Sequence, residues 1–300
     1  MTMSEVSHGQ GRLLPVLVVI MGLILIWYAG AVYLNSTQLI DRYDKRNVNW
    51  NLGQLATDAW RMERPVLPAP HQVGLELKKT VLDKRVSSKR SLVYHAGITL
   101  SSSLLGFCLG TLLGIGLAIG IVYVTTLDRS LMPWIIASQT VPILALAPMI
   151  IVVLGSIGIT GLFPKSVISM YLCFFPVVVG MVKGLRSPEP MLLDQMHTYH
   201  ANSMQVFFKL RLPSSIPFLF TSLKVAIALS VVGAIVAELP TGGQGGLRAR
   251  LLTGSYYGQT TMIWAALIVA SVVSALLVTA VGFCERIALY RLKGGQVIRA

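Results

Sequence analysis

The sequence predicts an all-α membrane protein, a polytopic bundle of about six transmembrane helices. The 300 residues are 54% hydrophobic and only 12% charged, and their mean hydropathy is +0.69. A chain of this kind is too apolar for an ordinary water-soluble domain. The apolar residues also gather into runs close to the roughly 20 residues that a helix needs to cross a hydrocarbon core. Lipid is therefore expected to be the solvent for much of the chain.

The first apolar run, residues 14–34, is longer than the core of a signal peptide and lacks a small-x-small cleavage site before Asn35. We therefore expect it to be a retained first span. Glycine is frequent in the next run, as in GFCLGTLLGIGLAIG, and small residues let helix backbones approach closely. The further spans are each bounded by charge, Pro or Gly: residues 98–124, 134–154, 167–184, 216–238 and 262–287.

The chain divides into three parts on this basis. Residues 1–95 hold the first span and a polar, external segment; residues 96–290 form the core, with a cytoplasmic loop at 186–215; residues 291–300 form a cytoplasmic tail. Within the polar segment, VGLELKKTVLDKRV predicts an amphipathic helix on the membrane surface. The segment from 35 to 95 holds eleven Lys and Arg residues, but the positive-inside rule does not decide the orientation of so long a loop.

Several classes of function are disfavoured. The net charge of +13 forms no basic reading face for nucleic acid, and Lys and Arg beside the spans fit contact with membrane lipid. Cys108, Cys173 and Cys284 lie in apolar runs without metal-ligand spacing, so no metal or other cofactor is expected. The pattern GxxxxGK[ST] occurs nowhere, so the chain has no nucleotide site of its own. We expect no catalytic residues.

Residues 186–215 are too polar to cross a bilayer. Six of them recur at spacings of three or four and would share one helical stripe: Leu192, Met196, Tyr199, Ser203, Val206 and Leu210. A mostly apolar stripe outside the membrane indicates a helix that fills a groove on a partner. The alternative is a helix folded back on its own bundle.

Here the chain resembles the permease subunits of ATP-binding-cassette (ABC) importers, in their nitrate, sulfonate and taurine branch. Those subunits carry a cytoplasmic signature: EAA, three residues, Gly, nine residues, then Ile-x-Leu-Pro. The same spacing is occupied here by Asp194, Gln195, Met196, His200, Leu210, Leu212 and Pro213. Both alanines and the glycine are replaced. The flanking stretches PVVVGMVKGLRSPEP and SIPFLFTSLKVAIALSVVGAIVAE are also similar, and the likeness covers residues 67–292.

The resemblance implies the fold of a type I ABC importer permease, multi-pass in a bacterial inner membrane with both termini in the cytosol. Its signature loop would be a coupling helix that docks into cytosolic ATPase subunits. An extracytoplasmic substrate-binding protein would deliver the solute, and a second copy of the chain would complete a homodimer. His200, at the glycine position, is expected to have positive φ. Its imidazole either contacts the ATPase or is a solvated turn residue.

Ionisable residues in or beside spans are candidates for function because their burial in lipid is costly. Lys224 either reaches back to headgroups or contacts substrate. Glu238 either helps to form an external gate or caps its helix. Glu285 and Arg286 mark a span boundary. The glycines of PTGGQGGLRAR form either a plain connection or a loop that contacts the delivery protein.

Two other functions are weighed against import by an ABC permease. A secondary transporter or channel would usually show an intramembrane acidic or His relay or repeated broken helices, and a membrane enzyme would show a cluster of catalytic side chains. The sequence shows neither. The stretch VAELPTGGQGGLRARLLTGSYYGQ favours a small nitrogen heterocycle as substrate, such as a pyrimidine vitamin precursor or riboflavin. Nitrate, a sulfonate or taurine is the alternative.

Overall fold

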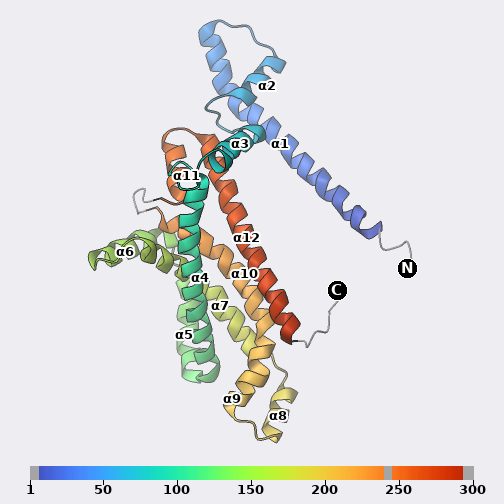
Figure 1. The fold of residues 1–300 in the computed structure, drawn as a ribbon, viewed down its shortest axis with the longest axis vertical. Coiled ribbons are helices and arrows are strands. Elements are labelled where there is room, and N and C mark those ends of the chain that lie inside the picture. The colour runs from blue at the N-terminus through green and yellow to red at the C-terminus, as the bar shows by residue number, and fades with distance from the viewer. Residues whose placement is uncertain (1–6, 240–244, 293–300) are drawn as a thin grey trace. The chain divides into compact units, whose positions relative to one another are not determined.

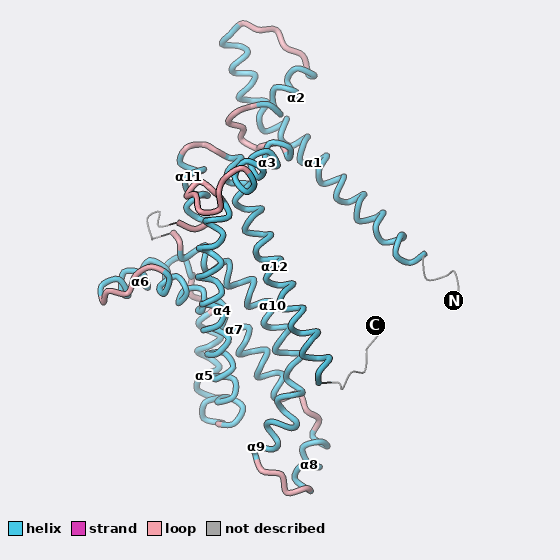
Figure 2. Tube along the Cα trace, in the orientation of Figure 1, coloured by secondary structure: helices cyan, strands magenta, loops and turns pink. Residues whose placement is uncertain are grey.

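The computed structural model describes residues 7–239 and 245–292, and its regular elements in those ranges are helices (Figures 1 and 2). The expected all-α architecture is confirmed. Gly242, Gly243 and the end of the expected C-terminal tail lie outside the described residues. The elements are α1 (Ser7–Arg46), α2 (Leu52–Arg61), α3 (Pro70–Leu77), π-helix η1 (Lys78–Leu82), α4 (Leu92–Tyr123), α5 (Thr125–Ser138), α6 (Ile143–Ser156), α7 (Leu162–Leu185), α8 (Pro190–Thr198), α9 (Ser203–Val206), π-helix η2 (Phe207–Arg211), α10 (Leu212–Ala237), α11 (Leu247–Tyr256) and α12 (Thr260–Leu292).

Among the described residues, 5 helices are long and apolar enough to cross a membrane, or up to 6 if one bent pair counts as a span. That pair, α5 and α6, corrects the prediction of a single helix over residues 134–154, since the two helices meet at 101°. Proline explains the break. Pro142 stands at the start of α6 with φ of −67°, and the residue before a proline is disfavoured in helical conformation.

The chain forms two compact units, residues 1–93 with 250–268, and residues 94–249 with 269–300. In the first unit, α1 continues well past residue 34, where the apolar run ends. Buried Asn35 explains how this extension is held: its side-chain oxygen accepts from the Val66 N–H (2.7 Å), and its amide donates to the Leu67 carbonyl (3.0 Å). A cluster of Leu39, Tyr43, Leu55, Ala59 and Met62 then packs α2 against α1.

Glycines bring the helices of the second unit together. A Cβ at Gly106, Gly110 or Gly114 of α4 would lie 2.4, 2.8 or 2.8 Å from the Cβ of Ser169, Cys173 or Val177 of α7, respectively. Real Cβ atoms do not approach this closely, so only glycine permits this spacing of the helices. Further along α7, Gly180 and Gly184 make similarly close contacts with Ser222 and Ser215 of α10. The glycine-rich run thus packs as the sequence predicts.

The second unit has two distinct ends. At one end, the C-terminal part of α4 packs with the end of α7 in a cluster that includes Ile121 and Leu185, with Phe207 and Leu212 against it. At the other end, Thr99 near the start of α4 donates to Glu238, which follows α10. The loop between α7 and α10 and the start of α4 therefore lie at opposite ends of this unit.

Candidate functional site

The loop between α7 and α10 is tied to the bundle at both of its roots. Arg186, directly after α7, forms an ion pair with Asp128 of α5 at 2.9 Å. Arg211, at the end of η2, donates from Nη1 to the Leu185 carbonyl at 3.2 Å. Its guanidinium also lies over the ring of Tyr123, 5.8 Å from the centroid. A force on this loop would therefore act directly on α5, α7 and α10.

The chain turns sharply in the middle of the loop at His200. Its φ is 51°, the left-handed region that glycine adopts freely and that histidine enters at some cost. The His200 N–H donates to the His197 carbonyl at 2.9 Å. Asn202 then starts α9 with a capping box, in which its side chain accepts from the Gln205 N–H at 2.9 Å. The expectation of positive φ at the glycine position of the family pattern is confirmed.

This turn overturns one prediction. Leu192 to Leu210 do not lie on one continuous helical stripe, because α8 ends at Thr198 and α9 begins at Ser203. The residues of the expected stripe and of the signature divide instead by exposure: Leu192, Asp194, Gln195, Tyr199, His200 and Ser203 are exposed, and Met196, Val206, Leu210, Leu212 and Pro213 are half-buried. Four large apolar side chains stand out in solvent: Met191 (78% exposed), Tyr199 (72%), Met204 (65%) and Phe208 (56%). We call these four residues the coupling patch.

At the opposite end of the second unit, Glu238 has a buried side chain with specific partners. It is 3% exposed. Its Oε1 accepts from the Thr99 hydroxyl at 2.6 Å and its Oε2 from the Arg248 N–H at 2.9 Å. The Leu247 N–H donates to the same Thr99 oxygen at 3.0 Å. The carboxylate thus joins the end of α10, the start of α4 and the start of α11.

Gly246 completes this junction. Its N–H donates to Nδ1 of His95 at 3.0 Å, and its φ is +106°. A Cβ there would lie 2.1 Å from the Glu238 side-chain carboxyl carbon, so both the conformation and the space require glycine. The glycine-rich stretch is therefore more than a plain connection at this position.

Lys224 has a partner that sequence reasoning missed. Its ammonium group forms an ion pair with Glu285, which joins α10 to α12. The sequence treated Glu285 as a span boundary only. The pairing could not be read from spacing because the two residues stand on helices far apart in the chain.

Three further polar residues were not predicted: His95, Thr99 and Lys165. All three are buried, and Lys165 of α7 is attracted electrostatically by Glu238. For His95 and Lys165 the signal available in the sequence was their position just before apolar runs, where an ionisable residue is costly and often functional. Among the described residues, no group of three or more His, Cys, Asp or Glu side chains could hold a metal ion.

Comparison with known proteins places this geometry in context. Residues 110–292 match the family model described as "Binding-protein-dependent transport system inner membrane component". The formylaminopyrimidine transport permease protein ThiX of Halalkalibacterium halodurans is 30% identical over 58% of this chain and 65% of its own length. The riboflavin transport system permease protein RibX of Chloroflexus aurantiacus is 29% identical over 74% of this chain and 79% of its own.

Other similar proteins carry different names. The putative aliphatic sulfonates transport permease protein SsuC of Bacillus subtilis is 27% identical over 74% of this chain and 76% of its own length. Among solved structures, a chain of the MetNI methionine ABC transporter in an inward-facing conformation matches with a TM-score of 0.58 at 18% identity, over 66% of this chain and 95% of that one. At this identity the match supports the fold alone.

Proposed function

The chain belongs to the family of binding-protein-dependent transport system inner membrane components, and from that premise we propose that its 186–215 loop docks onto a cytosolic ATPase and drives import of a small nitrogen heterocycle. As a member of this family, it is a multi-pass permease of the inner membrane that works with an ATPase and a binding protein, and it is not the ATPase itself. What we propose beyond family membership is the surface that docks onto the ATPase and the class of substrate.

The observation that carries the docking proposal is the coupling patch. Its four residues come from α8, the His200 turn, α9 and η2, yet all are more than half exposed on one short loop. Large apolar side chains outside the membrane mark a protein interface when they cluster in this way. The ion pair of Arg186 and the hydrogen bond of Arg211 supply the mechanical link, because they tie the loop to the helices that must move.

Charge introduced into the patch tests this function. Tyr199→Glu would bury an unpaired carboxylate in the interface, which costs several kcal/mol, so ATPase affinity should fall by about tenfold or more. Tyr256→Glu is the matched control, since Tyr256 of α11 is 82% exposed and lies outside the loop. Co-purification and titration of the ATPase with membranes carrying each variant give the readout. Equal ATPase affinity in both variants would remove the patch from the mechanism.

The substrate proposal follows the order of similarity among named relatives. Identity is 30% to the formylaminopyrimidine permease and 29% to the riboflavin permease, against 27% to the sulfonate permease and 24% to a nitrate permease of Leptolyngbya laminosa. We favour a neutral or weakly charged heterocycle on this basis. Nitrate, a sulfonate or taurine is the competing class of substrate. Because the differences in sequence identity are small, measurements of uptake must distinguish the two classes.

Competition for uptake separates the two classes. Cells that express the complete transporter should accumulate a labelled pyrimidine or riboflavin in an ATP-dependent manner, and excess taurine or nitrate should leave that accumulation unchanged. Uptake of labelled taurine that is unaffected by heterocycles would reverse the assignment.

We propose that two copies of this chain form the membrane pore. The chain carries one signature loop, so one copy presents one ATPase docking site. Native mass spectrometry of the purified transporter should find two permease chains with two ATPase chains. A complex holding one copy and a second, different permease would contradict the homodimer.

A further inference from the structure

We propose that a cluster of arginines on the first unit, outside the region that matches the family model, is a docking site for carboxylates of the external binding protein. This inference rests on the proposed orientation, in which residues 186–215 face the cytosol. The cluster surrounds a cavity of about 360 Å³ formed by the end of α1, by α2 and by the residues after α2. Its basic members are Arg42, Arg46, Arg61 and Arg64. We call this feature the arginine pocket.

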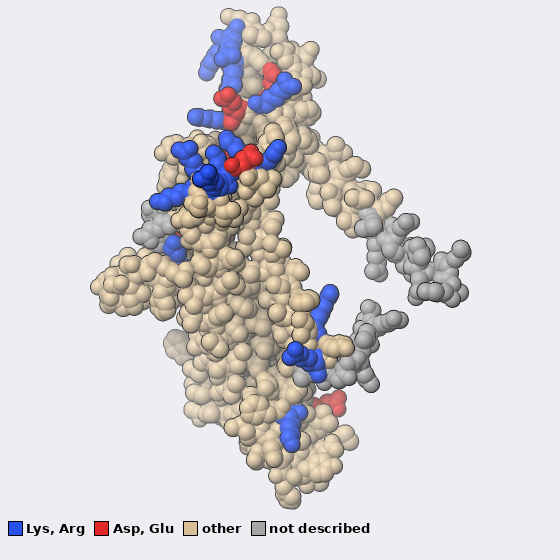
Figure 3. Space-filling view, in the orientation of Figure 1, with Lys and Arg blue, Asp and Glu red and all other residues tan. Residues whose placement is uncertain are grey.

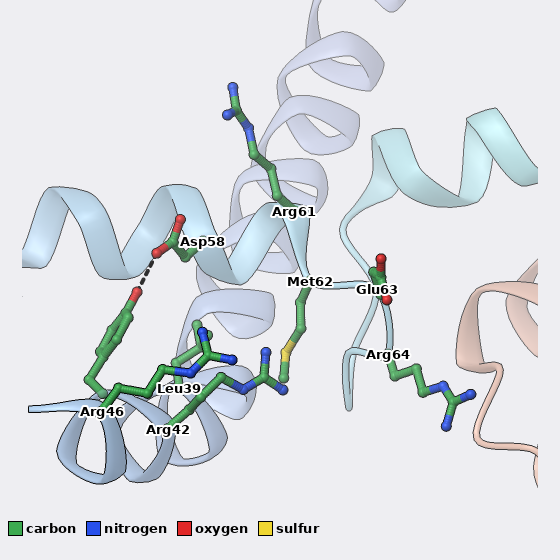
Figure 4. Close-up of a pocket in the computed structure, with 9 residues that line it drawn as sticks. Leu39, Arg42, Arg46, Asp58, Arg61, Met62, Glu63 and Arg64 are labelled. Carbon is green, nitrogen blue, oxygen red and sulfur yellow. Dashed lines mark hydrogen bonds between the residues drawn. The ribbon is translucent and has the colours of Figure 1, made fainter. Parts of the chain in front are cut away.

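The four arginines have no carboxylate partner in an ion pair among the described residues. Of the two acidic residues on the wall, Asp58 accepts the hydroxyl proton of Tyr43 in a hydrogen bond. Figure 4 shows Arg42 and Arg46 extending in the same direction from α1, the Arg42 guanidinium beside Met62 and the Arg46 guanidinium beside Leu39, while Arg61 and Arg64 point away from this pair. Adjacent unpaired guanidinium groups repel each other unless an anion lies between them, and their planar fork fits a carboxylate.

The basic surface extends beyond this pocket. A second cavity of about 500 Å³ in the same unit shares Glu63 and Arg64 with the first. Its other charged walls are Glu76, Lys79, Lys84, Arg90 and Arg250. Figure 3 shows Lys and Arg side chains gathered over the elements of this unit. A positive surface of this size attracts an acidic partner and accelerates its encounter.

On the proposed orientation, the position in the chain puts this surface on the external side of the inner membrane. The start of α4 lies at the end of the second unit that holds Glu238, opposite the coupling patch. If the coupling patch faces the cytosol, the chain that leads into α4 leaves the membrane on the external side. The family description names a binding protein as a partner, and an extracytoplasmic binding protein would act on that side.

Anionic lipid is a poorer occupant than a soluble protein. The apolar run of α1 ends at Leu34. Arg42 and Arg46 follow eight and twelve residues later on the same helix, which is about 12 and 18 Å along its axis. The headgroup layer adds only about 5–7 Å to each side of the hydrocarbon core. With α1 along the membrane normal, the helix carries the pair beyond the lipid phosphates and toward solution.

Charge reversal tests the site in the assembled transporter. The complete complex is placed in nanodiscs of neutral phosphatidylcholine, and the probe is the extracytoplasmic binding protein that stimulates ATP hydrolysis by the wild-type complex. Arg42→Glu with Arg46→Glu should slow association of that protein by about tenfold or more and flatten the dependence of the rate on salt. Lys45→Glu with Lys78→Glu is the matched control, because both lysines are exposed on the same unit and line neither cavity. The control should change the association rate less than twofold.

A second pair of variants guards against misfolding. Arg42→Lys with Arg46→Lys keeps the charge and removes the bidentate fork, so it should retain fast association and dissociate faster. Stimulated ATP hydrolysis at saturating binding protein should be the same in every variant. Equal association rates for the reversal and control pairs would overturn the proposal. The same variants are also compared in nanodiscs of anionic phosphatidylglycerol. If charge reversal weakened only the interaction with phosphatidylglycerol and left association of the binding protein unchanged, the arginines would form a lipid site and the proposal would fall. If no binding protein stimulates the wild-type complex, the proposed function itself fails.

Discussion

At the scale of single residues, His200 shows how the chain tolerates a departure from its family pattern. Its φ of 51° costs a non-glycine residue of order 1 kcal/mol. The sequence alone identified this position because the signature spacing placed His200 where other members have glycine. The imidazole is exposed at the turn of the 186–215 loop, and substitution of His200 separates a contact with the proposed ATPase partner from the backbone strain.

The first prediction concerns this strain. His200→Gly should leave the loop as stable as in the native protein or slightly more so, and His200→Ala should destabilise it, because alanine has neither the freedom of glycine nor the tolerance of histidine for positive φ. Hydrogen exchange of residues 197–206 measures the stability of the loop. If the imidazole contacts the ATPase, His200→Gly will also lower ATPase affinity. His197→Ala, three residues earlier in α8, is the control and should do neither.

The second prediction concerns the junction at Glu238, which we expect to hold the external gate together. Gly246→Ala would place a methyl group 2.1 Å from the Glu238 carboxyl carbon. The carboxylate must then leave the hydroxyl of Thr99 and the N–H of Arg248, at a cost of about 2–4 kcal/mol. ATP hydrolysis should become uncoupled from uptake, and residues near Arg248 should become more sensitive to protease.

Gly258→Ala provides the control for that experiment. Gly258 also has positive φ, +66°, but nothing lies within 4 Å of a Cβ built on it. The control therefore carries the backbone strain of about 1 kcal/mol without displacing a carboxylate. Normal coupling in both variants would show that the Glu238 junction only caps its helix.

At the scale of elements, the packing of α4 on α7 depends on a glycine at every fourth position. Gly110→Val should force the two helices apart, because its Cβ alone would lie 2.8 Å from the Cβ of Cys173. Overpacking of this kind costs about 1–3 kcal/mol. Thermal unfolding in detergent and the yield of assembled complex should both fall.

Gly116→Val isolates the packing effect. Gly116 lies on the same helix but is exposed, with nothing within 4 Å of a Cβ built on it. The same change of residue should therefore leave the melting temperature of the complex nearly unchanged. If both variants lower the melting temperature equally, helix propensity rather than the α4–α7 contact is responsible.

The bent pair of α5 and α6 shows where apolar patterning alone misleads. Residues 134–154 are apolar enough for one span. Apolar composition alone does not show whether the helix axis changes direction within them. Pro142 and the polar residues before it break the helix, and the following segment leaves at 101°. A proline in an apolar run indicates a break, but the angle of the break depends on what each half packs against.

At the scale of the whole molecule, the orientation in the membrane follows from the two ends of the second unit. Single cysteines at Met191 of the coupling patch and at Tyr256 of α11, both exposed, test it in a background without Cys108, Cys173 and Cys284. A membrane-impermeant thiol reagent should label Tyr256→Cys in spheroplasts. Met191→Cys should react only after the inner membrane is opened. Labelling of Met191→Cys in intact spheroplasts would invert the topology.

The sequence by itself determined the class of the protein, the positions of most spans and the spacing of the signature. These follow from local information: the length of apolar runs, the frequency of small residues in them and the spacing from Asp194 to Pro213. It also located the left-handed residue His200, because a family pattern records backbone constraints at single positions. The tertiary structure decided which distant residues meet. The pairs of Glu238 with Thr99 and of Lys224 with Glu285 depend on how helices far apart in the chain approach one another. Such contacts are set by the packing of side chains across helices, which no local period encodes.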